Sequence, residues 1–165
     1  MAKGRNPKTI GLISDTHGLL RPQGLRALEG SELIIHAGDV GDPEILEALK
    51  TLAPVFAVRG NVDTEPWAVA LPETEVIELE PATIYVLHDV HALDLDPVAA
   101  GFHIVVSGHS HEASREERNG VLFLNPGSAG PRRFDLPVTV ALLRLHPAPW
   151  KIDFIDLFGD QLRKG

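Results

Sequence analysis

The chain has 165 residues and a formal net charge of −8, with 44% apolar and 23% charged residues. These values suit a single soluble domain spanning residues 1–165, and the acidic surface disfavours long nucleic acid and anionic membranes as partners. The absence of cysteine excludes disulfides, a thiolate nucleophile and cysteine-bound zinc. Because no segment has the pattern of a signal peptide or a membrane span, a cytoplasmic protein is the default expectation.

The first sixty residues are predicted to alternate between strands and helices. Short apolar runs at 8–14, 32–38 and 54–60 are typical of buried strands. Helices are predicted at 21–30 and at 42–52, the latter with an aspartate as N-cap and a proline in its first turn. This β-α-β-α-β order indicates a parallel sheet with right-handed crossovers.

The rest of the chain is predicted to consist mainly of strands, mostly antiparallel. The pair Asn119-Gly120 stands between two extended runs and is a strong hairpin signal. The segment 97–101 is long enough for one helical turn at most. The other predicted strands are 75–80, 82–88, 103–108, 137–146 and 150–157.

Side chains that can bind metal follow most of the predicted buried strands. Ligands of open α/β sheets bind at the carboxyl ends of strands, where these side chains are expected to meet. Residues two apart in an extended segment face the same way, so Asp15 and His17 are predicted to share a site, as are His109 and His111. In a site with two ions, the two histidines of the second pair can serve different ions. The full set is Asp15, His17, Asp39, Asn61, His88, His109 and His111.

Each of these residues also has an ordinary structural interpretation. An aspartate or asparagine after a strand is often a turn residue or a helix cap, which is the role expected for Asp42. A single histidine at a strand end is more often a hydrogen-bonded or surface residue than a ligand. Coincidence is nevertheless a poor explanation for seven metal-binding side chains at the ends of successive predicted strands. Four further histidines are interpreted as structural: His36, His91, His103 and His146.

The order of these short blocks resembles that of the calcineurin-like metallophosphoesterases, in particular the small single-domain bacterial and archaeal phosphodiesterases. The similarity covers nearly the whole chain, and a complete ordered set of blocks is far more specific than one motif. A further block, NPGSAGPRR at 125–133, resembles one that is typical of the small members. The other blocks are DTHG at 15–18, GDVGD at 38–42, GNVD at 60–63, LHD at 87–89 and GHSH at 108–111.

The resemblance implies an α/β fold, a four-layer αββα sandwich of two mixed β-sheets flanked by helices. It also implies two divalent metal ions. One ion would be held by Asp15, His17, Asp39 and His111, and the other by Asp39, Asn61, His88 and His109.

Two departures from the family pattern stand out. Asp89 follows His88 where the family usually has glycine, which adds a carboxylate beside the second site. The segment between His88 and the strand at 103–108 is short, which predicts a turn in place of the usual helix.

The nitrogen and oxygen ligands suit Mn²⁺, the first expectation, with Ni²⁺, Fe, Co and Zn as alternatives. The predicted reaction is hydrolysis of a small phosphodiester by a hydroxide that bridges the two ions. Asp39, Asn61 and His17 are the candidate catalytic residues. Arg132 and Arg133 are candidate substrate contacts, although paired arginines at this place are equally expected to be exposed.

The proton donor to the leaving group is a separate question. Protein-phosphatase branches of the family carry a histidine after the asparagine of the GN block, and that histidine is assigned to this role. Val62 stands there in this chain and cannot donate a proton. His17 and Asp63 are the alternatives.

Two other functions remain as alternatives to a phosphodiesterase. One is a phosphomonoesterase or nuclease of the same fold. The other is a protein-binding scaffold similar to the retromer subunit of this fold, a role that tolerates loss of ligands. The complete ligand set favours the enzyme, and a homo-oligomer is left open.

Overall fold

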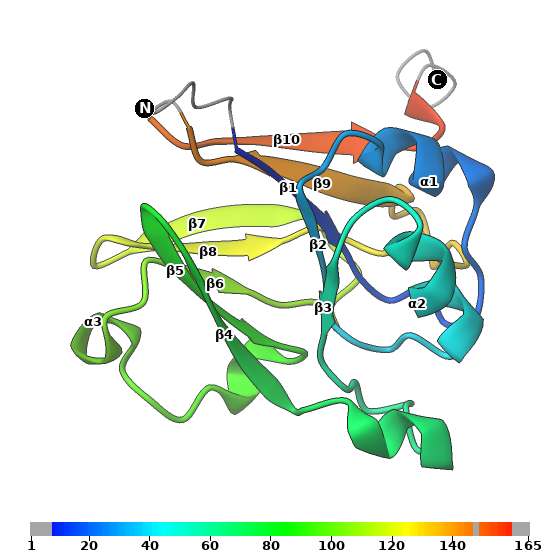
Figure 1. Cartoon of the computed structure of the whole chain (residues 1–165), viewed down its shortest axis with the longest axis horizontal. Helices are drawn as coiled ribbons and strands as arrows, with labels where there is room; N and C mark the ends of the chain where they lie inside the picture. Colours follow the sequence, from blue (N-terminus) through cyan, green and yellow to red (C-terminus); the bar gives the residue numbers. More distant parts are fainter. Residues whose placement is uncertain (1–7, 147–148, 160–165) are drawn as a thin grey trace.

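The computed structural model describes residues 8–146 and 149–159, which form a sandwich of two mixed five-stranded sheets (Figure 1). The strand order is β10-β9-β1-β2-β3 in the first sheet and β4-β5-β6-β8-β7 in the second. The first sheet contains β1 (Thr9–Ile13), β2 (Leu33–His36), β3 (Val55–Ala57), β9 (Thr139–Arg144) and β10 (Lys151–Asp156). The second contains β4 (Thr74–Leu79), β5 (Ala82–Leu87), β6 (Ile104–Val106), β7 (Ser114–Arg118) and β8 (Val121–Asn125).

The predicted β-α-β-α-β order of the first sixty residues is confirmed. Strands β1, β2 and β3 are parallel, and the connecting helices are α1 (Pro22–Leu28) and α2 (Pro43–Lys50). Helix α2 begins as expected, because the Asp42 carboxylate accepts a 2.9 Å hydrogen bond from the N–H of Glu44. Figure 1 shows both helices on the side of the first sheet that faces away from the second.

The second sheet has a thin outer layer. Only two short elements, η2 (Val90–Ala92) and α3 (Pro97–Ala100), lie between β5 and β6, so the predicted reduction of the usual helix to about one turn is confirmed. Two 3-10 segments, η2 and η1 (Pro66–Ala70), were not expected from the sequence. The β7–β8 hairpin turns at Asn119 and Gly120, which have φ angles of 52° and 82°, as a type I′ turn requires.

The main core lies between the two sheets. Leu12 and Ile35 of the first sheet pack in one buried cluster with Ile84 and Val106 of the second. A separate cluster fills the space between the first sheet and its two helices. The central strands are therefore buried on both faces, which explains why they read as continuous apolar runs. No helix within the described residues is long and apolar enough to cross a membrane.

Candidate metal centre

The seven predicted residues lie together in loops that follow β1, β2, β3, β5 and β6. They form two groups in which the ligand atoms lie within 4.8 Å of one another. Asn61 adjoins the second group, since its Oδ1 is 3.2 Å from Nδ1 of His109. The first group is Asp15, His17 and His111, and the second is Asp39, His88 and His109.

Asp39 lies between the two groups. Its Oδ2 is 3.5 Å from Nε2 of His17 in the first group and 3.2 Å from Nε2 of His88 in the second. Its Oδ1 accepts a 3.0 Å hydrogen bond from the N–H of Val62. One oxygen is thus held by the main chain while the other faces both groups, an arrangement that fits a carboxylate shared by two ions.

Asp15 is held in the same way. Its Oδ2 accepts hydrogen bonds from Oγ of Ser14 at 2.7 Å and from the N–H of His109 at 3.0 Å. Its Oδ1 lies 3.7 Å from Nε2 of His17 and 3.4 Å from Nε2 of His111.

Two of these atoms are buried without a partner. Oδ1 of Asp15 and Nε2 of His17 have no hydrogen-bond partner in the described part of the chain. A buried polar atom without a partner costs free energy, and a cation placed among these atoms would satisfy them. The residues therefore fit a divalent metal ion, as the resemblance noted in the sequence implies.

The backbone of the site differs from what the sequence predicted. Asp15 and His17 were expected to share a site because they follow one another in extended chain, but their φ angles are 55° and 46°. His109 and His111 have φ angles of 73° and 67°, and Asp39 has 58°. This left-handed conformation is unfavourable for residues with a Cβ by roughly 1–3 kcal/mol each and is concentrated at functional sites. The side chains converge because the loops are tightly coiled rather than extended.

Hydrogen bonds fix which ring nitrogens face the centre. Nδ1 of His88 donates to the carbonyl of Ala37 at 2.8 Å, which directs Nε2 at Asp39. Such a second partner is typical of histidines that bind metal. In His109 the ring is reversed, because Nδ1 faces Asn61 and Nε2 lies 3.8 Å from Oδ2 of Asp89. Asp89, which replaces the glycine usual in the family, thus places a carboxylate beside His109, a candidate ligand.

Burial and the opposing charges shift the pKa values of the site. Burial alone would lower the pKa of His88, but the Asp39 carboxylate and the Ala37 carbonyl raise it overall. Burial would raise the pKa values of Asp15 and Asp39, and hydrogen bonds and the neighbouring histidines lower both. Burial lowers the pKa of His111, which favours the neutral ring that a metal ion requires.

His36 lies beneath the centre and has the structural role that was predicted for it. It is fully buried, and its Nδ1 accepts a 3.1 Å hydrogen bond from the N–H of Gly38. Its Nε2 therefore carries the proton and lies 3.0 Å from Oγ1 of Thr16, which donates to the carbonyl of Val40 at 2.9 Å. Burial lowers the pKa of His36 to about 4. The neutral ring connects the loops that carry the two candidate aspartates.

Two glycines permit close approach to the candidate aspartates. A Cβ at Gly108 would collide with Oγ of Ser14 and stand 2.6 Å from Oδ2 of Asp15. A Cβ at Gly60 would collide with Oδ1 and the main-chain nitrogen of Asp39. The glycines of the GHSH and GNVD blocks are therefore required by packing against the site.

Asp63 is not placed to donate a proton. Its two carboxylate oxygens accept hydrogen bonds from the N–H groups of Val40, Gly41 and Gly60 at 2.9–3.1 Å. The side chain is buried and joins two of the site loops, so the suggestion of an acid at this position is wrong on geometry. It acts as a hydrogen-bond acceptor.

Sequence reasoning missed Asn125 as a supporting residue. Its Nδ2 donates to the carbonyl of Gly108 at 2.9 Å and to Oγ of Ser110 at 3.1 Å, and its Oδ1 accepts from the N–H of Gly127. Asn125 thus holds the GHSH loop in place. Two sequence signals pointed to it, its place at the end of an apolar strand and at the start of the NPGSAGPRR block, but neither indicated its hydrogen-bonding role.

The paired arginines are exposed. Nη1 of Arg132 donates to the carbonyl of Leu136 at 3.1 Å, within its own loop. Burial is the main cause of the lowered pKa of His111; the Asp15 carboxylate opposes this effect, and the charge of Arg133 adds to the lowering.

Comparison with known proteins identifies the family to which the chain belongs. The family model described as "Calcineurin-like phosphoesterase superfamily domain" matches residues 9–147. The chain belongs to the calcineurin-like phosphoesterase superfamily. A protein named probable metallophosphoesterase from Methanothermobacter thermautotrophicus is 34% identical to it over 148 residues, which cover 82% of this chain and 85% of that protein.

Two further relatives bear on the superfamily assignment. Phosphodiesterase MJ0936 of Methanocaldococcus jannaschii is 30% identical over 137 residues, which cover 72% of this chain and 82% of that enzyme. The solved structure of Vps29 from Entamoeba histolytica, described as complexed with zinc, superimposes with a TM-score of 0.70 at 25% identity. That match covers 90% of this chain and 99% of Vps29. The fold expected from the sequence, a sandwich of two mixed sheets, is confirmed.

Proposed function

We propose that this superfamily member is a phosphodiesterase that hydrolyses small phosphodiesters with two divalent metal ions, Mn²⁺ being the first expectation. The observation that carries the proposal is the shared position of Asp39 between two groups of candidate ligands. The buried, unpaired Oδ1 of Asp15 and Nε2 of His17 support a cation in the first group. The name of the Methanocaldococcus relative supports a diester substrate.

Two bound ions would supply an activated water and a positive clamp on the phosphoryl oxygens. The chain's own contribution is to hold its side chains in place before substrate binds. Asp15 and Asp39 each have one oxygen fixed by a main-chain N–H. Asp89 lies 3.8 Å from Nε2 of His109, while Nδ1 of this ring faces Asn61. We propose that this carboxylate favours that ring orientation, since a carboxylate beside a histidine is a common way to orient a metal ligand.

In the proposed reaction, the oxygen of a water molecule forms a bond to phosphorus while the bond from phosphorus to one alcohol oxygen breaks. The products are a phosphomonoester and an alcohol, whose oxygen takes up a proton that derives from water. Val62 has no proton to give, and Asp63 is engaged as an acceptor. His17 is the remaining side-chain candidate, and its Nε2 faces two carboxylates. Solvent is therefore the proposed source of the proton.

Arg133 is proposed as a contact to the substrate phosphate. Its positive charge contributes to the lowered pKa of His111, a member of the first ligand group, which supports a position near that group. A diester carries one negative charge, and the overall charge of −8 makes a local cation useful for attracting it. Arg132 is engaged with its own loop and is proposed to have a lesser role.

The experiment measures kcat/KM for two matched aryl esters, both with protein that has been loaded with Mn²⁺. Bis(p-nitrophenyl) phosphate should be hydrolysed with a higher kcat/KM than p-nitrophenyl phosphate. A higher value for the monoester would identify a phosphomonoesterase, and cleavage of long DNA at a higher rate would identify a nuclease. Absence of hydrolysis in protein that holds its metal would favour the protein-binding scaffold, the alternative that the resemblance to Vps29 keeps in view.

A further inference from the structure

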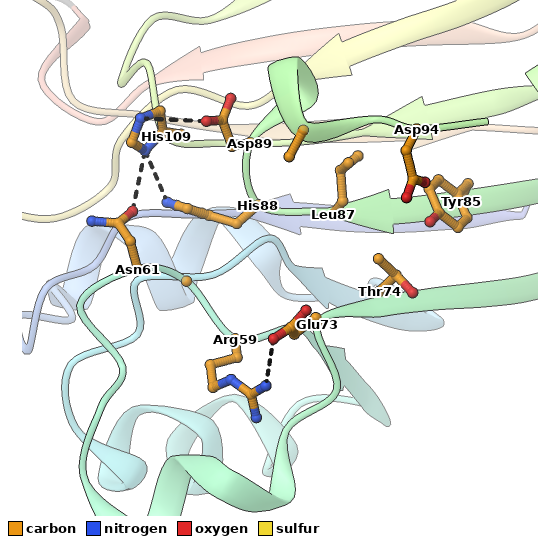
Figure 2. Close-up of a pocket in the computed structure, with 12 residues that line it drawn as sticks. Arg59, Asn61, Glu73, Thr74, Tyr85, Leu87, His88, Asp89, Asp94 and His109 are labelled. Carbon is orange, nitrogen blue, oxygen red and sulfur yellow. Dashed lines mark hydrogen bonds and ion pairs between the residues drawn. The ribbon is translucent and has the colours of Figure 1, made fainter. Parts of the chain in front are cut away.

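A pocket of about 370 Å³ adjoins the second ligand group and has no role in the chemistry described so far. Asn61, His88 and His109 line one end of it, while Tyr85 and Asp94 lie at the opposite end (Figure 2). Its volume falls in the range of sites that hold small organic groups. A phosphate held at the ligand end would direct one of its ester groups along this pocket.

The charges that line the pocket are predominantly negative. Three carboxylates, those of Glu73, Asp89 and Asp94, stand against the single guanidinium of Arg59, which gives a formal charge of −2. Arg59 is already engaged, because its Nη2 lies 3.0 Å from Oε2 of Glu73 and its Nη1 donates to a main-chain carbonyl at 2.8 Å. Asp89 is beside His109, at 3.8 Å. Asp94 is an exposed carboxylate at the pocket rim and forms no hydrogen bond or ion pair with residues 8–146 and 149–159, so its charge is free to meet a ligand.

A second feature of the same end points to a ligand independently of the acidic charge. Tyr85 is 7% exposed, and its ring stacks on Phe102 with the centroids 4.7 Å apart and the planes at 9°. Its hydroxyl forms no hydrogen bond with the described residues and points into the pocket (Figure 2). Although the ring is buried, the hydroxyl opens onto the pocket, and a hydroxyl without a protein partner is available to a bound molecule. Leu87 offers an apolar surface between this hydroxyl and the ligand end.

We propose that this pocket binds the ammonium-bearing alcohol of a phosphodiester substrate, a group of the 2-aminoethyl type. The ammonium would lie at Asp94 and the Tyr85 hydroxyl, its methylene groups at Leu87, and the phosphate at the Asn61–His109 end. An ammonium carries three hydrogen-bond donors, which suit a carboxylate and a hydroxyl. A second phosphate or a carboxylate in this place would meet the like charge of Asp94. This substrate class rests on the proposed function and narrows it.

The test uses two p-nitrophenyl diesters that differ in one group. In p-nitrophenyl 2-aminoethyl phosphate the second ester group ends in an ammonium, and in p-nitrophenyl propyl phosphate a methyl replaces it. In both, hydrolysis breaks the bond between phosphorus and the nitrophenol oxygen, so the leaving group is the same. We expect kcat/KM for the aminoethyl ester to exceed that for the propyl ester by about tenfold.

Variants locate the preference in the pocket. Asp94→Asn should lower the ratio of the two kcat/KM values by at least about threefold, because the amide keeps the shape and removes the charge. Glu32→Gln is the matched control, since Glu32 is an exposed carboxylate just before β2, at the opposite end of that strand from the site. It should leave the ratio at the wild-type value.

The outcomes separate this proposal from the function on which it rests. If neither ester is hydrolysed, the proposed function fails. If both are hydrolysed with a ratio near or below one, or if Asp94→Asn keeps the full preference, the enzyme is a phosphodiesterase and the ammonium pocket is wrong.

Discussion

The main-chain N–H of His109 donates a 3.0 Å hydrogen bond to Oδ2 of Asp15, 94 residues earlier in the chain. Asp15 follows β1 in the first sheet and His109 follows β6 in the second, so this bond joins the two sheets at the candidate centre. It also leaves Oδ1 of Asp15 facing His17 and His111. The position of the candidate ligands therefore depends on the packing of both sheets.

The first prediction concerns the shared carboxylate. Asp39→Asn keeps an oxygen for the Val62 N–H but removes the negative charge that faces both groups, so it should reduce the binding of both ions. His109→Ala should reduce only the second, because His109 belongs to one group. Elemental analysis after gel filtration measures the metal per chain. Greater loss in His109→Ala than in Asp39→Asn would contradict a shared role for Asp39.

His103→Ala is the matched control for the histidine variant. His103 directly precedes β6, at the end opposite to His109, and its Nδ1 accepts a hydrogen bond from the N–H of Thr83 at 2.9 Å. Its removal should cost about 1 kcal/mol of folding free energy and leave the metal content and the specific activity near the wild-type values. A large loss of activity in folded His103→Ala protein would mean that β6 is wrongly placed.

The second prediction compares two glycines. Gly108→Ala would force a methyl group against Ser14 and Asp15, so we expect a loss of about 1–3 kcal/mol of stability together with weaker metal binding. Gly24→Ala lies in α1, where an added Cβ would make ordinary contacts at 3.7 and 3.8 Å. It should raise stability by roughly 0.5–1 kcal/mol. Urea unfolding of both variants checks the two signs, and equal effects would refute the packing argument.

The third prediction concerns the pH dependence of folding through His36. This residue has a pKa of about 4 in the folded chain against 6.5 in the unfolded chain, so below pH 6.5 the unfolded chain binds the additional proton. Stability due to the neutral ring is thus complete above about pH 6.5 and is lost as the pH falls toward 4, a change of order 3 kcal/mol.

His36→Gln should be less stable at pH 7.5 by about 1–3 kcal/mol, because the amide replaces only one of the two hydrogen bonds of the ring. Its stability should also decline less steeply between pH 6.5 and 4 than that of the wild type, with both proteins free of metal. Urea titrations across this range give the two slopes. Identical slopes would show that folding does not lower the pKa of His36.

The fourth prediction follows from Val62, which exposes an apolar side chain where a proton donor would stand, and from Asp63, which is held by three N–H groups. Without a side-chain acid, negative charge builds on the departing oxygen. Rates on a series of diesters that differ only in the leaving group should therefore rise steeply as the pKa of that group falls. A flat dependence, with chemistry shown to limit the rate, would require an unassigned donor, and His17 would be the first to test.

Much of the fold and the identity of the candidate site could be predicted from the sequence. Each predicted strand overlaps an observed one, although the runs at 54–60 and 103–108 extend beyond β3 and β6. The residues that follow the strands meet because the carboxyl ends of parallel strands in both sheets face the same site. The left-handed conformation of Asp15 and His17 could not be predicted, since their spacing is equally compatible with extended chain. The supporting hydrogen bonds of Asn125 and Asp63 depend on partners brought close by tertiary packing. Local sequence patterns carry no information about such tertiary partners.

The most direct test of the two-metal account is a titration of Mn²⁺ into chelator-treated protein, with hydrolysis of bis(p-nitrophenyl) phosphate followed at each step. The metal-free protein should be inactive, and activity should rise to a plateau when about two ions are bound per chain, as the two ligand groups that share Asp39 require. Undiminished turnover in the metal-free protein, or a plateau at one ion per chain, would contradict the account.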